Sequence, residues 1–264
     1  IAFWGHGKNF QNESAGHPKE RFRRFFLDKP DWWFAYTPLT EEILLTANYP
    51  ASKITVLNNA IDTGALQNHA RSISEDELCR LRKKLGIQGN HTGVFCGSIY
   101  PGKRMDVLMD AARRIRSQIS DFELVVIGAG PDEHHVKAAA MATPWIHYAG
   151  PRFGYEKALF MKLGQVFLLP YIVGLAILDS FALGIPIIAM RDGNHSPEIA
   201  YLQHNANGII TSNETDDYAN AVCKLFDDTE KRRKIVEQCL VDAKKYTIEN
   251  MATNFTDGII KCLN

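Results

Sequence analysis

Several features that indicate other classes of protein are missing from this chain of 264 residues. Lysine plus arginine and aspartate plus glutamate number 30 each, so the formal net charge is zero, whereas a dedicated nucleic-acid binder is usually basic. No apolar run reaches the roughly 18 residues of a membrane span. No basic segment leads into an apolar stretch as in a signal peptide. We therefore expect a cytoplasmic protein without a nucleic-acid partner.

The cysteines form no recognisable pattern. They are five, an odd number, and none belongs to a C-x-x-C pair. This favours reduced, packed thiols over disulfides or a zinc site. The five are Cys79, Cys96, Cys223, Cys239 and Cys262. An initiating Met is missing as well, since the chain begins at Ile1 inside an apolar run, and we expect the chain to be cut near its N-terminal side.

What is present is an alternation of short apolar runs with longer amphipathic segments. The apolar runs predict strands at residues 1–4, 33–36, 54–57, 93–96, 123–127, 146–148, 166–169, 187–189 and 208–210. The amphipathic segments predict helices at residues 19–27, 39–46, 75–85, 104–117, 133–141, 155–163 and 175–183. This alternation is typical of βαβ units, so we predict an α/β fold with a parallel, doubly wound sheet covered on both faces.

The remaining segments are predicted to be helices and one loop. After residue 210 the strands stop, and residues 215–226, 229–244 and 249–261 are predicted to be helices. Residues 62–73 are polar and are predicted to form a loop. In a doubly wound sheet, ligands bind outside the carboxyl ends of the strands. We therefore expect the site in the loops that follow the strands ending at Cys96, Ile127, Tyr148 and Leu169.

The loop after Cys96 runs from Gly97 and Ser98 to Lys103 and Arg104, where a helix is predicted to begin. Glycine lets the backbone approach a ligand closely. Two cations at a helix start serve no capping purpose, because the helix dipole there is already positive. Their placement favours an anion shared between them. Phosphate binding is the interpretation we prefer to an ordinary loop with solvated cations.

The loop after Ile127 contains Gly128 and Gly130 and invites a dinucleotide interpretation. The G-x-G-x-x-G fingerprint would need glycine where the sequence has Glu133, and the strand before it is not the first of the fold. A nicotinamide site is therefore disfavoured. We expect these glycines to form a tight turn, with Pro131 opening the helix that follows.

The most informative stretch is VFLLPYIVGLAILDSFALGIPIIAMRDGNHSPEI, residues 166–199. A strand pattern is followed by a loop with Gly174, a helix carrying Asp179, a second strand and a loop with Glu198. A helix start offers unpaired N–H groups and a positive dipole end to an anion. An acid on that helix can accept hydrogen bonds from sugar hydroxyls, although a lone acid on a helix is usually only solvated. The stretch predicts a receptor for a phosphorylated, hydroxylated ligand.

Two N-terminal features admit both functional and structural interpretations. His6 follows a strand pattern and lies between two glycines, and histidine is the commonest proton-transfer residue. A structural turn histidine is an equal alternative. Residues 17–29 form a basic stretch with three Phe, which would suit peripheral contact with a membrane surface. A helix that packs its Phe stripe on its own domain is the favoured interpretation.

Taken together, these motifs resemble the GT-B glycosyltransferases, in particular the large retaining family 4. ITVLNNAID, at residues 54–62, resembles that family's interdomain stretch xVIPNGVD, and residues 97–103 resemble its G-R…K diphosphate loop. ELVVIGAGP, from residue 123, resembles LxIVGxGP, and residues 146–151 resemble the strand whose following loop faces the nucleobase. Residues 169–186 resemble LPSxxEGFGLxxLEAMAxGxP, which contains the E-x7-E motif. The tail from Tyr246 resembles the closing helices.

The resemblance implies a division into domains. Residues 1–50 would be the end of an N-terminal acceptor domain with a second Rossmann-like sheet. Residues 51–245 would be the donor-binding domain, and residues 246–264 would be the closing helix that crosses back to the N-terminal domain. The acceptor cleft would then be incomplete, so we expect this chain to bind donor nucleotide and to transfer little or no sugar alone.

The resemblance also implies roles for single residues. The donor diphosphate would be bound by Gly97, Ser98, Lys103, Arg104, Gly174 and Leu175. Asp179 takes the place of the acid that holds the ribose. Pro151 and Arg152 would face the nucleobase. His6 falls where the family has a histidine near the reacting centre, and is the candidate catalytic residue.

Three positions depart from the family pattern. The first acid of the E-x7-E motif is Tyr171 here, and the second is the shorter Asp179. The family's arginine before the phosphate lysine is Ser98, for which Arg104 would partly compensate. A V-G-L sequence followed by H-S-P-E, ending at Glu198, also occurs in a subgroup with a modified motif. We interpret the changes as a subfamily feature.

The implied activity is transfer of a sugar, with retention, from a nucleotide-sugar donor to a glycan or lipid-linked acceptor of a surface polysaccharide. The donor is a substrate, so no separate cofactor is expected, and the sequence has no D-x-D motif, which fits a metal-independent site. Two alternatives remain. Tyr171 and Ser98 would also suit a non-catalytic module that binds a nucleotide sugar, and a GT-B sugar epimerase would share the fold.

Overall fold

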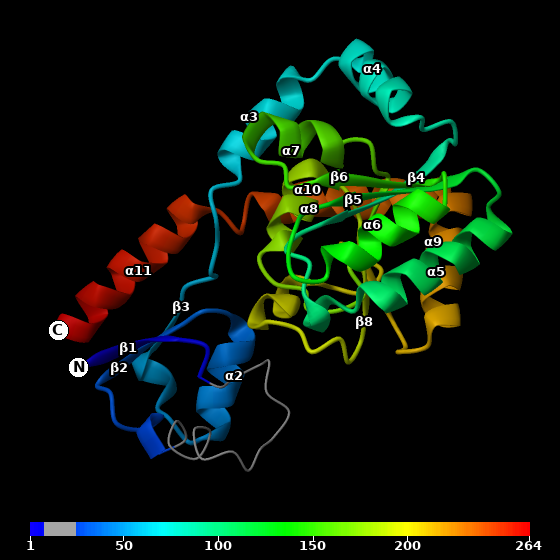
Figure 1. Cartoon of the computed structure of the whole chain (residues 1–264). Coiled ribbons are helices and arrows are strands. Elements are labelled where there is room, and N and C mark those ends of the chain that lie inside the picture. Colours follow the sequence, from blue (N-terminus) through cyan, green and yellow to red (C-terminus); the bar gives the residue numbers. More distant parts are fainter. Residues whose placement is uncertain (8–24) are drawn as a thin grey trace.

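The computed structural model describes residues 1–7 and 25–264 and arranges them in two α/β parts, each built on a parallel sheet (Figure 1). The smaller part has the strand order β1-β2-β3. Its elements are β1 (Ala2–Gly5), β2 (Trp32–Ala35), α2 (Pro38–Thr46), the short 3-10 helix η1 (Ala51–Lys53) and β3 (Ile54–Val56). Both chain ends lie beside this small sheet (Figure 1).

The larger part is a six-stranded sheet in which every strand pairs in parallel with its neighbours, in the order β6-β5-β4-β7-β8-β9. Its strands are β4 (His91–Cys96), β5 (Phe122–Ile127), β6 (Ile146–Gly150), β7 (Val166–Leu168), β8 (Ile187–Met190) and β9 (Gly208–Thr211). The chain winds outward from β4 to β6 and then returns to begin again at β7. The direction of winding therefore reverses between β4 and β7, and this switch point is where such sheets bind ligands.

Helices cover both faces of the large sheet. The helices of this part are α3 (Gly64–Ser72), α4 (Glu75–Leu85), α5 (Met105–Gln118), α6 (Glu133–Ala142), α7 (Gly154–Met161), α8 (Ala176–Leu183), α9 (Thr215–Asp227) and α10 (Thr229–Ala243), with the 3-10 helices η2 (Pro101–Lys103) and η3 (Pro197–Tyr201). The last helix, α11 (Ile248–Leu263), belongs to the small sheet. Helix α5 contacts α6 and α9, whereas α8 contacts α3 and α10. The fold class predicted from the sequence is confirmed.

The central strands are mostly apolar, with polar side chains only near their amino ends, because both faces of the sheet are covered. Every residue of β5, FELVVI, is buried. The same core takes in β4, β7 and β8 with the inner faces of α5, α8 and α9. A strand buried on both sides must place its functional groups beyond its ends, so the chemistry of this sheet lies in its loops.

The prediction of a loop at residues 62–73 is wrong, because these residues form α3. The side chain of Asp62 accepts a hydrogen bond from the backbone N–H of Gly64, 3.0 Å away, at the start of the helix. Leu66 and Ile73 are buried against α7 and α8. Leu66, Ala70 and Ile73 follow helical spacing, but the other residues are polar, so burial of one narrow stripe stabilises the helix.

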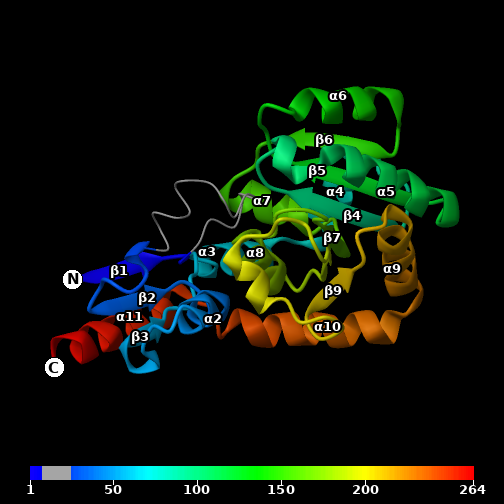
Figure 2. The ribbon, with the colours of Figure 1, turned by 90° about the horizontal axis from the view of Figure 1, so that it is seen from below.

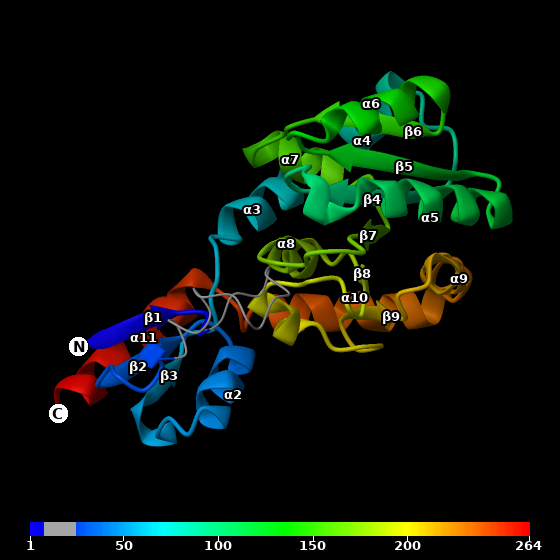
Figure 3. The same ribbon diagram turned by 60° about the horizontal axis from the view of Figure 1, so that its bottom comes forward.

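The last helix returns to the small sheet. Helix α10 leads along the large part toward α11, which lies against β2 and β3 (Figure 2). The ring of Phe255 stacks on that of Phe34, with 4.5 Å between centroids and 7° between planes. Asn254 Nδ2 donates to the carbonyl of Leu57 at 3.1 Å. The chain thus crosses between the two parts at α3 and again before α11 (Figure 3).

The nine predicted strands are all present, with ends that differ by a few residues. The predicted helices within the described residues are present as well. Most of the helix predicted at residues 19–27 and most of the basic stretch 17–29 lie outside the described residues. None of the helices in the ranges 1–7 and 25–264 is long and apolar enough to cross a bilayer.

Candidate functional site

A cavity of about 320 Å³ lies at the carboxyl ends of β4, β5 and β6. The loops after these three strands form its wall, together with one side chain of α7. Its lining residues are Cys96, Gly97, Ser98, Ile127, Gly128, Ala129, Pro151, Arg152, Phe153 and Lys157. Four residues that the sequence analysis assigned to a donor site, Gly97, Ser98, Pro151 and Arg152, are therefore brought together from two separate loops.

The floor of this cavity depends on glycine. The N–H of Gly97 donates to the carbonyl of Ile127 at 3.0 Å, which ties the β4 loop to the β5 loop. A Cβ added to Gly128 would lie 1.9 Å from the carbonyl oxygen of Gly97, and one added to Gly130 would lie 2.0 Å from that of Ile99. Both glycines also have φ near +150°, in the region that other residues rarely adopt. The tight turn expected here is confirmed, and it explains both glycines without a dinucleotide.

Lys103 ends the 3-10 helix η2 and is buried, with 8% of its surface exposed. Its ammonium donates to the main-chain carbonyl of Ile172 at 2.5 Å. Burial lowers the pKa of Lys103 to about 8. The lysine therefore connects the loop after β4 with the loop after β7, on the two sides of the switch point.

Arg104 turns to a different partner. Its guanidinium makes hydrogen bonds of 2.8–3.2 Å with both carboxylate oxygens of Asp106, and these bonds raise the pKa of Arg104. The same guanidinium lies over the ring of Tyr171, 5.4 Å from its centroid. Lys103 and Arg104 thus do not form the shared anion clamp expected from their adjacency. Both cations contact the β7 loop, Lys103 through the carbonyl of Ile172 and Arg104 through the ring of Tyr171, but the charge of Arg104 is paired with Asp106.

The loop after β7, residues 170–175, is held in an unusual conformation. Ile172 has a φ of +49°, which is rare for a β-branched residue and costs on the order of 1–3 kcal/mol. The N–H of Ile172 donates to the carbonyl of Gly193 at 2.7 Å. The next N–H, that of Val173, donates to Nδ1 of His195 at 3.0 Å. The loop is therefore fixed from the β8 side as well as by Lys103.

His195 was not identified from the sequence as a site residue. It is buried, and its Nε2 lies 2.6 Å from the carbonyl of Met190 while Nδ1 accepts from Val173. This arrangement requires the neutral ring with its proton on Nε2. Burial lowers the pKa of His195, which favours that neutral form. In the sequence, His195 stands out only as the first residue of the HSPE motif, two residues after Gly193. Its contact with the β7 loop is set by the fold.

Asp179 lies in the first turn of α8, shortly after the Gly174 and Leu175 turn that opens the helix. Its carboxylate is buried and its Oδ2 lies 2.7 Å from the ammonium of Lys157 on α7. Burial is the largest effect on this group and raises the pKa of Asp179, while Lys157 opposes the rise. Lys157 also lines the cavity, and its sequence context gives no sign of this because a lysine on an amphipathic helix is usually solvated.

Glu198 connects the two parts of the molecule. It is buried, and its Oε1 accepts a hydrogen bond of 2.7 Å from Nδ2 of Asn59 in the stretch that links β3 to α3. Its Oε2 is within 4.0 Å of the position that a Cβ on Gly174 would occupy. The hydroxyl of Tyr201, one helical turn further along, donates to the carbonyl of Asn59 at 3.1 Å. The acid therefore lies between the α8 turn and the interdomain segment.

Arg152 and His6 occupy contrasting positions. The guanidinium of Arg152 lies 4.7 Å from the ring centroid of Phe160, and its Nε is the one side-chain polar atom of the described residues that is buried without a hydrogen-bond partner. His6 is exposed just after β1, and its ring packs edge-on against Tyr36 at 4.1 Å between centroids. His6 belongs to the small sheet and does not line the cavity.

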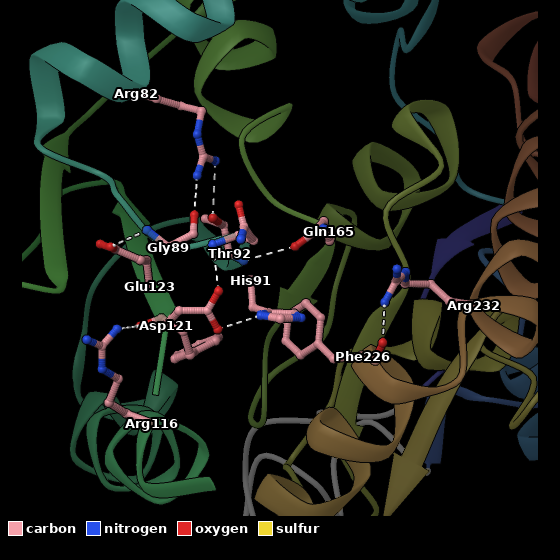
Figure 4. Close-up of polar contacts among 12 residues, drawn as sticks. Arg82, Gly89, His91, Thr92, Arg116, Asp121, Glu123, Gln165, Phe226 and Arg232 are labelled. Atoms are coloured by element: carbon pink, nitrogen blue, oxygen red, sulfur yellow. Dashed lines mark hydrogen bonds and ion pairs between the residues drawn. The ribbon is translucent and has the colours of Figure 1, made fainter. Parts of the chain in front are cut away.

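Polar side chains also gather at the amino ends of the strands, opposite the cavity, but there they hydrogen-bond to one another and to the backbone (Figure 4). Asp121 lies 2.7 Å from Nδ1 of His91, and Glu123 accepts from the N–H of Gly89 at 2.9 Å. Gln165 accepts from the N–H of Thr92 at 3.0 Å. This network ties the amino ends of β4 and β5 to the loops around them. Within the described ranges, no group of three or more acidic, histidine or cysteine side chains is arranged to hold a metal ion.

Two parallel α/β sheets, with a cavity at the carboxyl ends of the larger one, are the architecture of the GT-B glycosyltransferases that this chain resembles in structure. The solved structure of Alr3699/HepE from Anabaena, in complex with UDP and glucose, superposes with a TM-score of 0.76. That comparison covers 98% of this chain and 70% of the other at 16% identity. The chain belongs to the glycosyl transferases group 1, whose family model matches residues 90–228, more than half of its length.

The matches to curated relatives cover a smaller part of each relative than the match to this solved structure does. A D-inositol 3-phosphate glycosyltransferase of Stackebrandtia nassauensis is 27% identical over 187 residues, which are 65% of this chain and 42% of the relative. The sulfoquinovosyl transferase SQD2 of Arabidopsis thaliana is 20% identical over 210 residues, 78% of this chain and 39% of the relative. The chain therefore spans about half the length, or less, of these relatives.

Proposed function

We propose that this chain carries the donor site of a retaining glycosyltransferase of family 4, which transfers a sugar from a nucleotide-sugar donor. The observation that carries the proposal is that Lys103 joins the β4 loop, whose first residues line the cavity, to the β7 loop. The Gly174 turn at the start of α8 adds N–H groups and a positive dipole end on the same side. Anabaena Alr3699/HepE, which shares the fold, is described with UDP-glucose, and this supports a nucleotide-sugar donor here.

On this proposal the nucleotide spans the two loops. The nucleobase lies by Pro151 and Arg152, the ribose by Asp179, and the diphosphate between the Gly97–Ser98 turn and the start of α8 at Gly174 and Leu175. Arg104 reaches the diphosphate after leaving Asp106. His6, supplied by the small sheet, lies near the reacting carbon when the two parts close.

The chemistry needs no protein nucleophile. The bond between the sugar C1 and the diphosphate oxygen breaks, and the acceptor oxygen bonds to C1 on the same face. The acceptor proton passes to the departing phosphate oxygen. The protein supplies fixed positive charge where negative charge develops, from Lys103 and the helix start. In this proposal these groups take the place of a metal ion or a cofactor. The proposed acceptor is a glycan or lipid-linked precursor of a surface polysaccharide.

The test uses the full-length protein with radiolabelled nucleotide sugars and a panel of lipid-linked and free glycan acceptors. We expect transfer to an acceptor, with an α-linked product from an α-linked donor by NMR. A β-linked product would contradict retention. Release of an epimerised free sugar without acceptor would indicate the epimerase alternative. Binding of the donor with no product from any acceptor would favour the non-catalytic module that Tyr171 and Ser98 suggest.

A further inference from the structure

Lys157 is a side chain of the cavity for which the sequence analysis provides no role. It lies one turn into α7, and its side chain lines the same wall as Ser98 and Arg152. Only 24% of that side chain is exposed. A solvated lysine on a helix surface would extend away from the protein, whereas this one is directed inward across the base of the cavity.

The partner of Lys157 is the buried carboxylate of Asp179. One N–H of the ammonium is used by Asp179 Oδ2 at 2.7 Å. Among residues 1–7 and 25–264, neither the other two N–H groups of Lys157 nor Oδ1 of Asp179 takes part in another hydrogen bond. Cys96, at the end of β4, is close enough for both charges to act on its pKa, which burial raises to about 12. Lys157 therefore lines the foot of the cavity with Asp179 buried behind it, and the pair keeps donors and an acceptor that no other described residue uses.

Stability alone does not explain this pair. Removing two charges from water costs several kcal/mol, and a buried pair is often no better than an apolar pair of similar volume. The other lysine and arginine ion pairs of the described residues involve side chains that are about a third exposed or more. Lys157 and Asp179 are the exception, and Lys157 lines the cavity.

We propose that Lys157 is a specificity-determining residue that acts with Asp179 to recognise the vicinal diol of the nucleotide ribose. Each hydroxyl of a cis-diol is both a donor and an acceptor. Asp179 Oδ1 accepts from one hydroxyl, and the ammonium of Lys157 donates to the oxygen of the other. A charged partner distinguishes a ligand with a hydroxyl from one without it more strongly than a neutral partner does. The reason is that a missing hydroxyl leaves a buried charged group unpaired. This inference rests on the proposed function, since it needs a nucleotide in the cavity.

The test compares ribose and deoxyribose ligands on the protein as it exists. Titration calorimetry measures UDP, GDP and ADP first, and then the 2′-deoxy and 3′-deoxy forms of the one that binds best. We expect at least one deoxy form to bind about tenfold more weakly than the parent, the loss of one charged hydrogen bond. In Lys157→Met, which keeps the apolar stem, we expect the parent to bind about tenfold more weakly and the preference for the diol to fall to about twofold. Lys83→Met, on the exposed face of α4, is the control and should change neither value.

Each result is decisive. Wild-type protein that binds no nucleotide would refute the proposed donor site itself. Wild-type protein that binds the ribose and both deoxy forms equally would overturn the role of Lys157 while leaving the donor site in place. An unchanged diol preference in folded Lys157→Met would do the same. If Lys157→Met does not fold, Lys157→Gln replaces it; this variant removes the charge, and its preference for the diol must fall below that of the wild type.

Discussion

The ammonium of Lys103 donates a hydrogen bond of 2.5 Å to the main-chain carbonyl of Ile172, a β-branched residue with a φ of +49°. Backbone strain of this kind persists only where the surroundings over-determine it, and it concentrates at functional sites. Here Lys103 fixes the loop from one side of the switch point, and His195 fixes it from the other. A loop held in this way presents the N–H groups of Gly174 and Leu175, at its end, to a ligand in advance of binding, so binding does not have to order it.

The first prediction concerns proton uptake by Lys103. Its pKa of about 8 in the folded protein is low because the ammonium is buried. A diphosphate beside it favours the charged form and raises the pKa. Nucleotide binding at pH 8.5 should therefore take up a fraction of a proton, and affinity should fall as the pH rises through about 8. Calorimetry in buffers of different ionisation enthalpy measures the uptake.

In Lys103→Met that uptake should disappear. The same lowered pKa implies that the unfolded wild-type chain binds more protons than the folded chain between about pH 8 and 10.5. The free energy of unfolding contributed by this residue should then rise with pH over that window. A variant with the same proton uptake and the same pH profile as the wild type would exclude Lys103 as the titrating group.

The second prediction concerns His195. Its neutral ring accepts from the N–H of Val173, and burial lowers the pKa of His195 below its usual 6.5. The unfolded chain then binds more protons below pH 6.5, so the free energy of unfolding should fall as the pH decreases through this range. In His195→Ala the fall should be smaller, as followed by urea denaturation at pH 7.5, 6.5 and 5.5. His204→Ala, a histidine on the exposed surface, is the control and should keep the wild-type profile.

The third prediction concerns the contact between the two parts. Glu198→Ala leaves the buried amide of Asn59 without its acceptor, which costs about 1–3 kcal/mol. Chemical denaturation should show this loss, whereas Glu214→Ala, at an exposed position before α9, should change stability by less than about 0.5 kcal/mol. Equal stability of the two variants would mean that the Asn59–Glu198 hydrogen bond does not hold the parts together.

The fourth prediction concerns Gly128. An added methyl group would overlap the carbonyl of Gly97, and the φ of +144° adds strain. Gly128→Ala should therefore lose about 2–4 kcal/mol of stability, and the β4 loop should move, with weaker nucleotide binding. Gly5→Ala is the matched control, because its methyl group meets nothing within 4 Å. A stable Gly128→Ala with unaltered binding would contradict the close approach of the two loops.

The sequence predicted the fold well because parallel strands buried on both faces are continuous apolar runs. Residues 123–127 lie within β5, where only Glu123 at the amino end interrupts the apolar run. The prediction from the sequence failed at α3. The apolar stripe there is only Leu66, Ala70 and Ile73, and the packing that stabilises the helix comes from α7 and α8. A helix stabilised mainly by tertiary contact leaves little local signal.

The site was predicted in part for a similar reason. Gly97 and Pro151 lie directly after strands, and the topology alone brings strand ends to one edge. The direction of a long side chain is not set in this way. Lys103 and Arg104 are adjacent in sequence, yet one reaches Ile172 and the other Asp106. His195 and Lys157 act through contacts with residues 22 positions away.

The central claim is that this cavity and the Lys103-supported loop bind a nucleoside diphosphate. Titration calorimetry with UDP, GDP and ADP, each against its nucleoside, tests it most directly. We expect one diphosphate to bind at least about tenfold more tightly than its nucleoside, and Lys103→Met to remove that difference while nucleoside binding is kept. No binding of any diphosphate by folded protein, or an equal loss for diphosphate and nucleoside in the variant, would contradict the claim.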